Sequence, residues 1–356
     1  MALLQFALAA CGDTTRTART PEPLVLLDSI VLQESDSTLI GEPAGIAAFA
    51  EGILVADRRA GVVRAYDRSG ALLRAYGRRG SGPGEWARGP RLFFSDGDTI
   101  AVATDGSQTK WFALPGGMPL GAHPNPGFLA LTASVDGIVY GVINLERGTS
   151  LREVSWDGVD LRQGGHVPEL AARSTLIARM LSMPALALLP GDSVVMAFQG
   201  SDYLFFGAFE RQPYDSVLVP PIRRRGARRE LLLEVNDRDP STVGPALYQP
   251  SYPGAIAAIA GGAAIAVVHL DMTFVENRRM TGRPYVSVVV RGNRSTCADI
   301  AISGSTDPLP NVAFQGDTLL VLTQEVRDTT SSSVLRRYQV RPASCNDAAT
   351  PKARPD

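Results

Sequence analysis

Short apolar runs alternate with turn residues along most of the chain, and the same pattern returns six times. Each time, an apolar run reaches a turn containing glycine or aspartate, and a second β-rich run follows at once. The six turns are Glu51-Gly52, Gly97-Asp98, Asp136-Gly137, Gly191-Asp192, Gly261-Gly262 and Gly316-Asp317. Because units of this kind cannot bury their apolar faces without neighbours, the repetition predicts a repeat architecture.

Five of the six units contain four predicted strands, whereas the last contains three. The strands predicted for the first unit are Ala44–Ala50, Ile53–Asp57, Val62–Asp67 and Ala71–Tyr76. Those predicted for the sixth unit are Asn311–Gln315, Thr318–Val326 and Val334–Val340. A further β-rich segment, Leu24–Glu34, lies near the N-terminus and has no partners within a unit of its own.

The segment Leu24–Glu34 therefore supplies the missing outer strand of the sixth unit. This pairing closes the chain into a ring and leaves no unpaired ring edge. Four-stranded units arranged radially around a channel form a β-propeller. The sequence thus predicts an all-β fold, a six-bladed β-propeller over residues 24–345, in which the N-terminal strand completes the last blade.

Two segments interrupt the strand pattern. Pro168–Ser182 has apolar residues at helical spacing, and Arg223–Asn236 opens with arginines and continues into a predicted short helix. Both lie between predicted units, so we expect them to be insertions over one face of the disc. In repeat folds, such insertions commonly mark the face that binds ligands.

Composition narrows the classes of function. Of the 356 residues 45% are hydrophobic, which is enough for a large core, and the net charge is −1. A chain without a basic excess is not expected to bind nucleic acid in general.

The N-terminus predicts export and lipidation. Met1–Ala10 is apolar, and Leu8-Ala9-Ala10-Cys11 matches the lipobox of bacterial lipoproteins, in which the cysteine thiol receives the lipid. The alternative is an ordinary apolar N-terminus with a chance cysteine. We predict a signal peptide over residues 1–11, a flexible tether over 12–23 and a disordered tail over 346–356. The protein would then be held in the cell envelope, in the periplasm or at the outer membrane, by its lipid anchor alone.

Two cysteines remain after Cys11. In an exported protein, Cys297 and Cys345 suggest one disulfide, and the alternative is two independent buried thiols.

One glycine-rich motif carries a family resemblance. Gly77-Arg78-Arg79-Gly80-Ser81-Gly82-Pro83-Gly84-Glu85-Trp86 resembles the Gly-x-Gly-x-Gly-Pro-Gly-Glu-Phe signature of bacterial six-bladed propellers of the NHL-like or TolB-like type, and Asp67-Arg68-Ser69-Gly70 resembles their Asp-x-x-Gly hairpin. The resemblance implies a propeller lipoprotein of the envelope. Some NHL-like propellers are lyases or lactonases that hold a metal in the channel, whereas others bind proteins or glycans. We expect Trp86 to pack between two blades.

Candidate catalytic and metal-binding residues are few. The glycine-rich loop lacks the ending of a P-loop, and the three histidines, His123, His166 and His269, have no metal-binding spacing. His269 and Asp271 are candidates for metal ligands in the channel, although a buried structural role is the more common one for such a histidine. Asp57 and Asp105 end equivalent strands and would suit channel calcium, although aspartate there more often caps a turn. We predict no catalytic residues and no other cofactor or metal.

The arginine-rich insertion is the clearest candidate binding surface. Its members are Arg223, Arg224, Arg225, Arg228 and Arg229. Guanidinium groups bind carboxylates and phosphates through paired hydrogen bonds. The alternative is a solvated loop whose arginines pair locally with Glu230, Glu234, Asp237 and Asp239. The sequence predicts a binding or scaffold lipoprotein with a protein, glycan or acidic partner, and the alternative is a metal-dependent hydrolase or lyase of the NHL-like type.

Overall fold

The computed structural model describes residues 22–96, 99–125, 130–181, 185–211, 213–242, 251–275, 279–302, 310–327 and 330–345. The predicted signal peptide with Cys11, nearly all of the tether, the C-terminal tail and the predicted turn Gly97-Asp98 lie outside the described residues.

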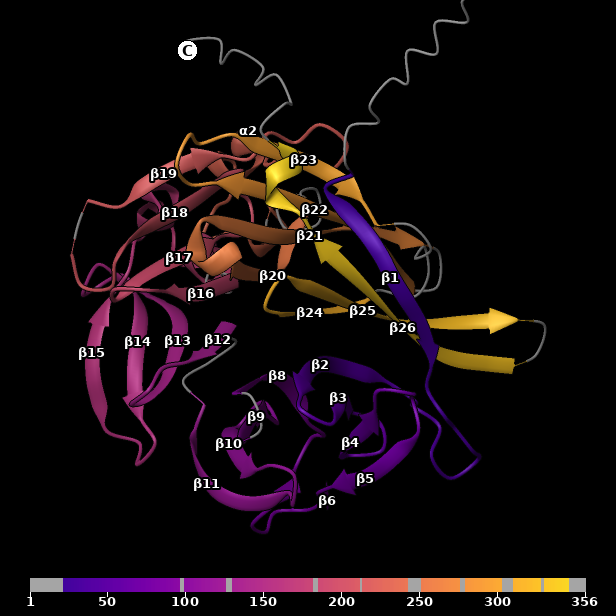
Figure 1. Ribbon diagram of the computed structural model, residues 1–356. Coiled ribbons are helices and arrows are strands. Elements are labelled where there is room, and N and C mark those ends of the chain that lie inside the picture. Colours follow the sequence, from indigo (N-terminus) through magenta and orange to yellow (C-terminus); the bar gives the residue numbers. More distant parts are fainter. Residues whose placement is uncertain are drawn as a thin grey trace, which may run out of the picture.

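Six four-stranded antiparallel sheets surround a common axis (Figure 1). Blade 1 consists of β2 (Pro43–Phe49), β3 (Gly52–Asp57), β4 (Val62–Asp67) and β5 (Leu72–Tyr76). Blade 2 consists of β8 (Arg91–Asp96), β9 (Ile100–Thr104), β10 (Gln108–Ala113) and β11 (Met118–Pro124). Blade 3 consists of β12 (Ala130–Ala133), β13 (Gly137–Asn144), β14 (Thr149–Ser155) and β15 (Asp160–Gly164).

The second half of the chain repeats this order. Blade 4 consists of β16 (Ala185–Leu189), β17 (Ser193–Ala197), β18 (Tyr203–Ala208) and β19 (Asp215–Leu218). Blade 5 consists of β20 (Tyr252–Ile259), β21 (Ala264–Val275), β22 (Arg279–Val290) and β23 (Thr296–Ala301). Blade 6 consists of β24 (Asn311–Gln315), β25 (Thr318–Arg327), β26 (Thr330–Val340) and β1 (Leu24–Val31).

The ring closes as the sequence predicts. Strand β1 pairs antiparallel with β26, from Leu24 opposite Val340 to Val31 opposite Val334. The N-terminal strand therefore forms the outer strand of the blade whose other three strands come from the C-terminal end of the chain. The six-bladed propeller and its mode of closure are confirmed.

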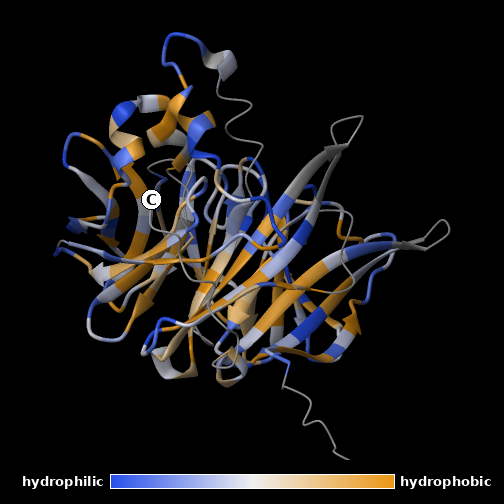
Figure 2. Cartoon of the chain, turned by 90° about the horizontal axis from the view of Figure 1, so that it is seen from above, coloured by the Kyte–Doolittle hydropathy of each residue, from blue (hydrophilic) through white to orange (hydrophobic). Residues whose placement is uncertain are grey.

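The hydrophobic core lies between the blades, and Figure 2 shows apolar positions running along the strands. Among the described residues, a separate buried cluster fills each of the six interfaces between neighbouring blades, including the interface of blades 6 and 1. At the interface of blades 1 and 2, Trp86 is 2% exposed and its ring centroid lies 6.5 Å from that of Phe112. The expected packing of Trp86 between two blades is confirmed.

The glycine-rich motif crosses between these blades. It contains a short parallel pair, β6 (Arg78–Arg79) with β7 (Glu85–Trp86). Gly77 has φ +75°, in the left-handed region, and an added Cβ would lie 2.2 Å from Nε1 of Trp86. Glycine is therefore required where the chain passes the buried indole.

The two ends of the propeller differ. The insertion face is the end at which β3 finishes with Asp57 and the inner strands begin, and it carries both connections that interrupt the strand pattern. The turn face is the opposite end, at which Glu51-Gly52, Gly261-Gly262 and Gly316-Asp317 lie. The chain enters and leaves the propeller near the turn face, because Arg341 N–H donates to Pro23 O (2.8 Å) and Val340 N–H to Asp317 O (2.9 Å).

The helical insertions are shorter than expected. Pro168–Ser182 does not form one helix but a 3-10 turn, η1 (Glu169–Arg173), and a separate helix, α1 (Thr175–Leu181). Ser174 interrupts them because it is extended and its Oγ accepts the Leu176 and Ile177 N–H groups. The second insertion is helical only over α2 (Arg229–Leu233), with a 3-10 turn η2 (Pro240–Thr242) beyond it. No helix in the described part of the chain is long and apolar enough to span a membrane.

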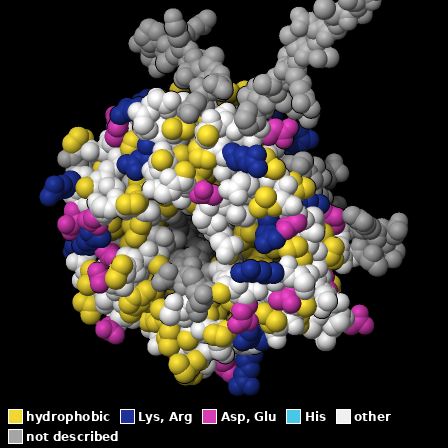
Figure 3. Space-filling model, viewed as in Figure 1, with side chains coloured by type: hydrophobic (Ala, Val, Ile, Leu, Met, Phe, Trp, Pro, Cys, Tyr) yellow, Lys and Arg dark blue, Asp and Glu magenta, His cyan; other side chains and the backbone are white. Residues whose placement is uncertain are grey.

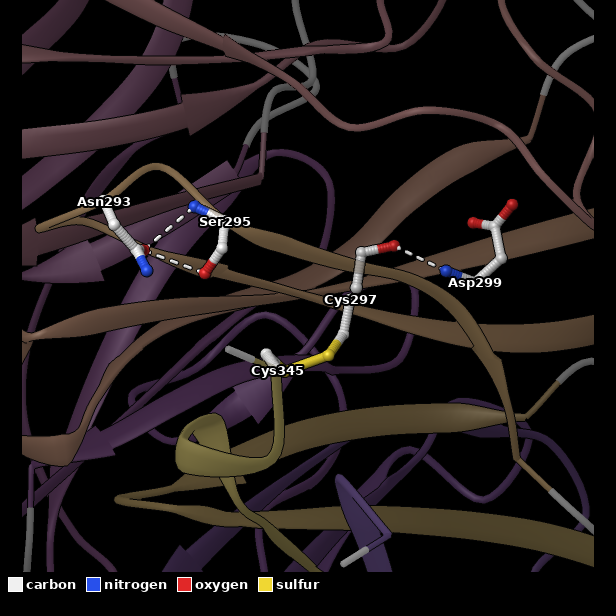
Figure 4. Close-up of a disulfide and its surroundings, with 6 residues drawn as sticks. Asn293, Ser295, Cys297, Asp299 and Cys345 are labelled. Atoms are coloured by element: carbon white, nitrogen blue, oxygen red, sulfur yellow. Dashed lines mark hydrogen bonds between the residues drawn. A yellow bond between two sulfur atoms is a disulfide. The ribbon is translucent and has the colours of Figure 1, made fainter. Parts of the chain in front are cut away.

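The predicted disulfide is confirmed. Cys297, on the outer strand of blade 5, is bonded to Cys345 in the 3-10 turn η5 (Pro342–Cys345) that follows blade 6 (Figure 4). The two Cα atoms are 5.3 Å apart, and Cys345 is fully buried. The crosslink therefore fixes the end of the closing blade to its neighbour.

Replacing both cysteines should weaken the fold. The bond closes a loop of 48 residues, which in the chain-entropy model stabilises the protein by about 4 kcal/mol. We expect Cys297→Ala/Cys345→Ala to lower the free energy of unfolding by about this amount in urea denaturation. Reduced wild-type protein should match the variant, and a variant as stable as the oxidised protein would contradict the prediction.

Candidate functional site

The inner strands of the six blades surround the axis, and the space-filling view shows the molecule hollowed at its centre (Figure 3). On the insertion face, the surroundings of this channel include the start of β8, the start of β20 and the arginine-rich connection between blades 4 and 5. The candidate residues from the sequence are distributed around this face.

Arg224 is buried and holds the insertion in place. Its guanidinium bonds Asp202 (2.7 Å) and Asp299 (3.0 Å) and also donates to Val219 O (2.7 Å). Asp299, which is fully buried on β23, also accepts the backbone N–H groups of three consecutive residues, Ile222 (2.5 Å), Arg223 (2.7 Å) and Arg224 (3.1 Å). Successive N–H groups of this kind form a concave anion site, and here a carboxylate of the protein itself fills it.

Asp299 thus holds residues 222–224 as a loop ahead of the helix, which begins at Arg229. The partners of Arg224 are also not those considered from the sequence, since Asp202 and Asp299 lie in blades 4 and 5 rather than in the insertion.

The other four arginines of the cluster differ in their surroundings. Arg225 pairs with Asp271 (2.5 Å), and Arg228 pairs with Glu230 (2.9 Å). Of the four acidic residues that the sequence suggested as partners, Glu230 alone pairs with the cluster within the described residues. The side chains of Arg223 and Arg229 are exposed, and neither forms an ion pair within the described ranges. The structure thus divides the predicted cluster into a structural arginine, two paired ones and two that face solvent.

The three histidines lie apart and are each packed among aromatic or apolar groups. Nε2 of His123 lies 3.0 Å from the Tyr140 hydroxyl, and the ring of His166 stacks on Phe205 with centroids 4.3 Å apart. His269 is 4% exposed, and burial holds its pKa well below the usual value, with the Arg224 charge adding to the effect. Within the described ranges, no three histidine, cysteine or acidic side chains gather as metal ligands do.

Asp57 and Asp105 organise equivalent turns of blades 1 and 2. Asp57 is fully buried, accepts the N–H groups of Gly41 (3.1 Å) and Ala60 (3.1 Å), and pairs with Arg64 (2.5 Å). Asp105 accepts N–H groups from Ala87, Ser107 and Gln108 and lies 3.5 Å from Nζ of the buried Lys110. These donors occupy the carboxylate oxygens that a calcium ion would need.

Two cavities lie away from these residues. One of about 210 Å³ lies between blades 6 and 1 and is lined by apolar residues such as Ile53 and Leu335, together with Arg68. The other, wider and about 610 Å³, lies between blades 3 and 4 and contains Glu153, Arg162 and Asp192. In the second cavity Arg162 already pairs with both carboxylates.

Sequence reasoning missed a second group of arginines on the insertion face. Arg58, Arg59, Arg79, Arg88 and Arg91 are all exposed and come from two segments of blades 1 and 2. In the sequence they are spread over 34 positions in four separate places, so no local cluster marks them. The sequence did contain one indication of this group. Each of these arginines precedes or follows a turn at the same end of a predicted blade.

Because of its buried carboxylates, the fold is expected to lose stability as the pH falls into the acidic range. Burial alone would raise the pKa of Asp105, but hydrogen bonds from the Ser107 hydroxyl and from three N–H groups outweigh it and lower the pKa to about 2. The ionised carboxylate therefore stabilises the fold fully above about pH 3.8, and this contribution is lost as the pH falls through about 2. We expect Asp105→Asn to be destabilising at pH 7 and much less so at pH 2, as measured by urea denaturation at both values. An equal loss of stability at the two pH values would contradict this assignment.

Comparisons with known proteins found similar structures but no matching family. No protein-family model matches the sequence, and no curated protein matches it. A Bacteroides fragilis protein named only as an exported protein is similar in structure, with TM-score 0.56 and 11% identity over 90% of this chain and 96% of that chain. The WD40 domain of Neurospora crassa Pan2 has TM-score 0.48 and 10% identity, over 89% of this chain and 95% of that chain. The β-propeller domain of Myceliophteria thermophila Cps50 (Swd1) has TM-score 0.46 and 9% identity, over 88% of this chain and 99% of that chain. At 11% identity, the similarity to the Bacteroides fragilis protein concerns the fold alone.

Proposed function

We propose that this protein is an envelope-anchored binding or scaffold protein that recognises an acidic partner on its insertion face. The main support for the proposal is the location of the insertions and extended hairpins, which a minimal four-stranded blade lacks. Both insertions lie on that face, and the hairpins β21–β22 and β25–β26 extend beyond the neighbouring strands there, as Figure 2 shows. Such additions to a repeat scaffold are typical of a ligand-binding face.

The proposed lipid anchor is compatible with a binding site on the insertion face. The chain enters the propeller near the turn face at Pro23, and the proposed tether from Gly12 to Pro23 would reach at most about 40 Å when fully extended. A lipid on Cys11 would therefore keep the start of the propeller, at the turn face, within about 40 Å of the membrane. The similarity to a protein named as exported supports this location.

The charges of the insertion favour an acidic partner. Asp299 and Arg224 fix the backbone from which Arg223 projects, and α2 begins at Arg229. Guanidinium groups on a fixed backbone lose less conformational freedom when they bind a carboxylate or phosphate than those on a loose loop. The alternative is an NHL-like enzyme with a metal in the channel; among the described residues, no three histidine, cysteine or acidic side chains gather as metal ligands do.

Removing the two solvent-facing arginines tests this proposal. Arg223→Ala/Arg229→Ala should lower the salt concentration at which the full-length protein elutes from immobilised poly-L-glutamate, because two cationic contacts are lost while the buried Arg224 remains. The thermal midpoint should stay unchanged, since both side chains are exposed.

The matched control is Arg68→Ala/Arg211→Ala, which removes the same charge from exposed side chains at the turn face. This control should elute like the wild-type protein. If the two double variants elute at the same salt concentration, Arg223 and Arg229 are not the binding site.

A further inference from the structure

Two turns meet on the insertion face between blades 1 and 2. The β3–β4 turn contributes Arg58 and Arg59, and the connection from β5 to β8 contributes Arg79, Arg88 and Arg91. We call these five residues the arginine rim. The turns are in direct contact, because Arg79 Nη2 donates to Arg59 O (3.1 Å) and a Cβ added to Gly89 would lie 2.2 Å from Arg58 O.

Buried carboxylates fix both turns and leave the arginines outside. Asp57 binds the β3–β4 turn through Ala60 N–H, and Asp105 binds the connection through Ala87 N–H (3.1 Å). Both carboxylates already pair with buried cations, Asp57 with Arg64 and Asp105 with Lys110, and neither forms an ion pair with the arginines of the turns.

Three of the five rim arginines have no ion-pair partner among the described residues. Arg58 pairs with Glu42, and the adjacent Arg78 pairs with Glu85. The exposed side chains of Arg59, Arg79 and Arg88 form no ion pair with any of the described residues. Like charges held close together repel one another, so the surface is stabilised when an anion lies over it.

Arg91 extends the rim toward the channel. It is the first residue of the inner strand β8 and is accessible to solvent, although packing of much of the side chain among protein atoms lowers its pKa. The like charge of Arg58 lowers the pKa of Arg91 further. The positive surface thus continues from the outer turn to the mouth of the channel.

We propose that the arginine rim is a binding site for a ligand that carries several carboxylate or phosphate groups and lies across the channel mouth over blades 1 and 2. Guanidinium groups match both kinds of anion through paired hydrogen bonds, and their fixed turns reduce the ordering that binding requires. The site extends the proposed function, because it uses the same face, but it lies across the ring from Arg223 and Arg229 and can be tested separately.

The test compares two triple variants and one double variant of the full-length protein. Arg59→Ala/Arg79→Ala/Arg88→Ala removes the rim, Arg223→Ala/Arg229→Ala removes the insertion arginines, and Arg68→Ala/Arg211→Ala/Arg291→Ala removes three exposed arginines of the turn face as the matched control. Binding of fluorescently labelled oligogalacturonate (carboxylate) and inorganic polyphosphate (phosphate) is followed by anisotropy, with neutral dextran as the blank.

We expect the rim variant to bind at least one of the two polyanions at least about tenfold more weakly than the wild type, with a reduced dependence on salt, while the turn-face control keeps wild-type affinity. The polyanion that shows the larger loss identifies the anion. Arg59→Lys/Arg79→Lys/Arg88→Lys, which keeps charge without the planar fork, should retain part of the affinity. Thermal midpoints check that every variant is folded.

Wild-type affinity of the rim variant for both polyanions, or an equal loss in the turn-face control, would overturn the proposal. If only the insertion variant loses affinity, the rim is not the site and the proposed function stands. If the rim variant alone loses affinity, the rim is the site and the insertion arginines are not. If no variant differs from the wild type, both proposals fail.

Discussion

The structure depends on closing a ring of blades whose apolar faces can be buried only against one another. Each interface between neighbouring blades contains its own buried cluster, and the seam between blades 6 and 1 is no exception, with Ile46 and Leu320 packed across it. A seam left open would expose two such faces to water, at a cost proportional to the apolar area. Strand β1 spans this seam, because it pairs with β26 in blade 6 and the chain then continues into β2 of blade 1, while the Cys297–Cys345 bond fixes the end of blade 6 to blade 5.

Once the ring is closed, buried aspartates determine the shape of the insertion face. Asp57, Asp105 and Asp299 are each buried and each accepts backbone N–H groups of a neighbouring loop. An unpaired buried carboxylate is costly, so these loops are held tightly by the groups that satisfy it. The same bonds direct acidic groups inward and arginines outward, and for this reason a nearly neutral protein presents positive surfaces on one face.

Sequence reasoning recovered the strands far better than the site. The strand ranges agree to within a few residues over most of the ring, for instance Val62–Asp67 as observed, because alternation and turn chemistry act over a few positions. Errors arose where side chains competed with the local pattern. Ser174 divides a segment that has continuous helical spacing, and the residues that Asp299 binds form a loop ahead of α2. The arginine insertion stood out because its residues are adjacent, whereas the arginine rim is assembled from separate turns.

The sequence by itself determined the number of blades, their order and the strand that closes the ring, since six repeats with one strand missing allow only one economical completion. Tertiary structure decided what each charged group does. Arg224 lies 75 positions from Asp299 and Arg225 lies 46 positions from Asp271, so no local pattern distinguishes these arginines from the exposed Arg223 between blades 4 and 5. The physical reason is that the charge partner of a side chain is set by which loops the closed ring brings together, and that proximity is not encoded in any short stretch of the chain.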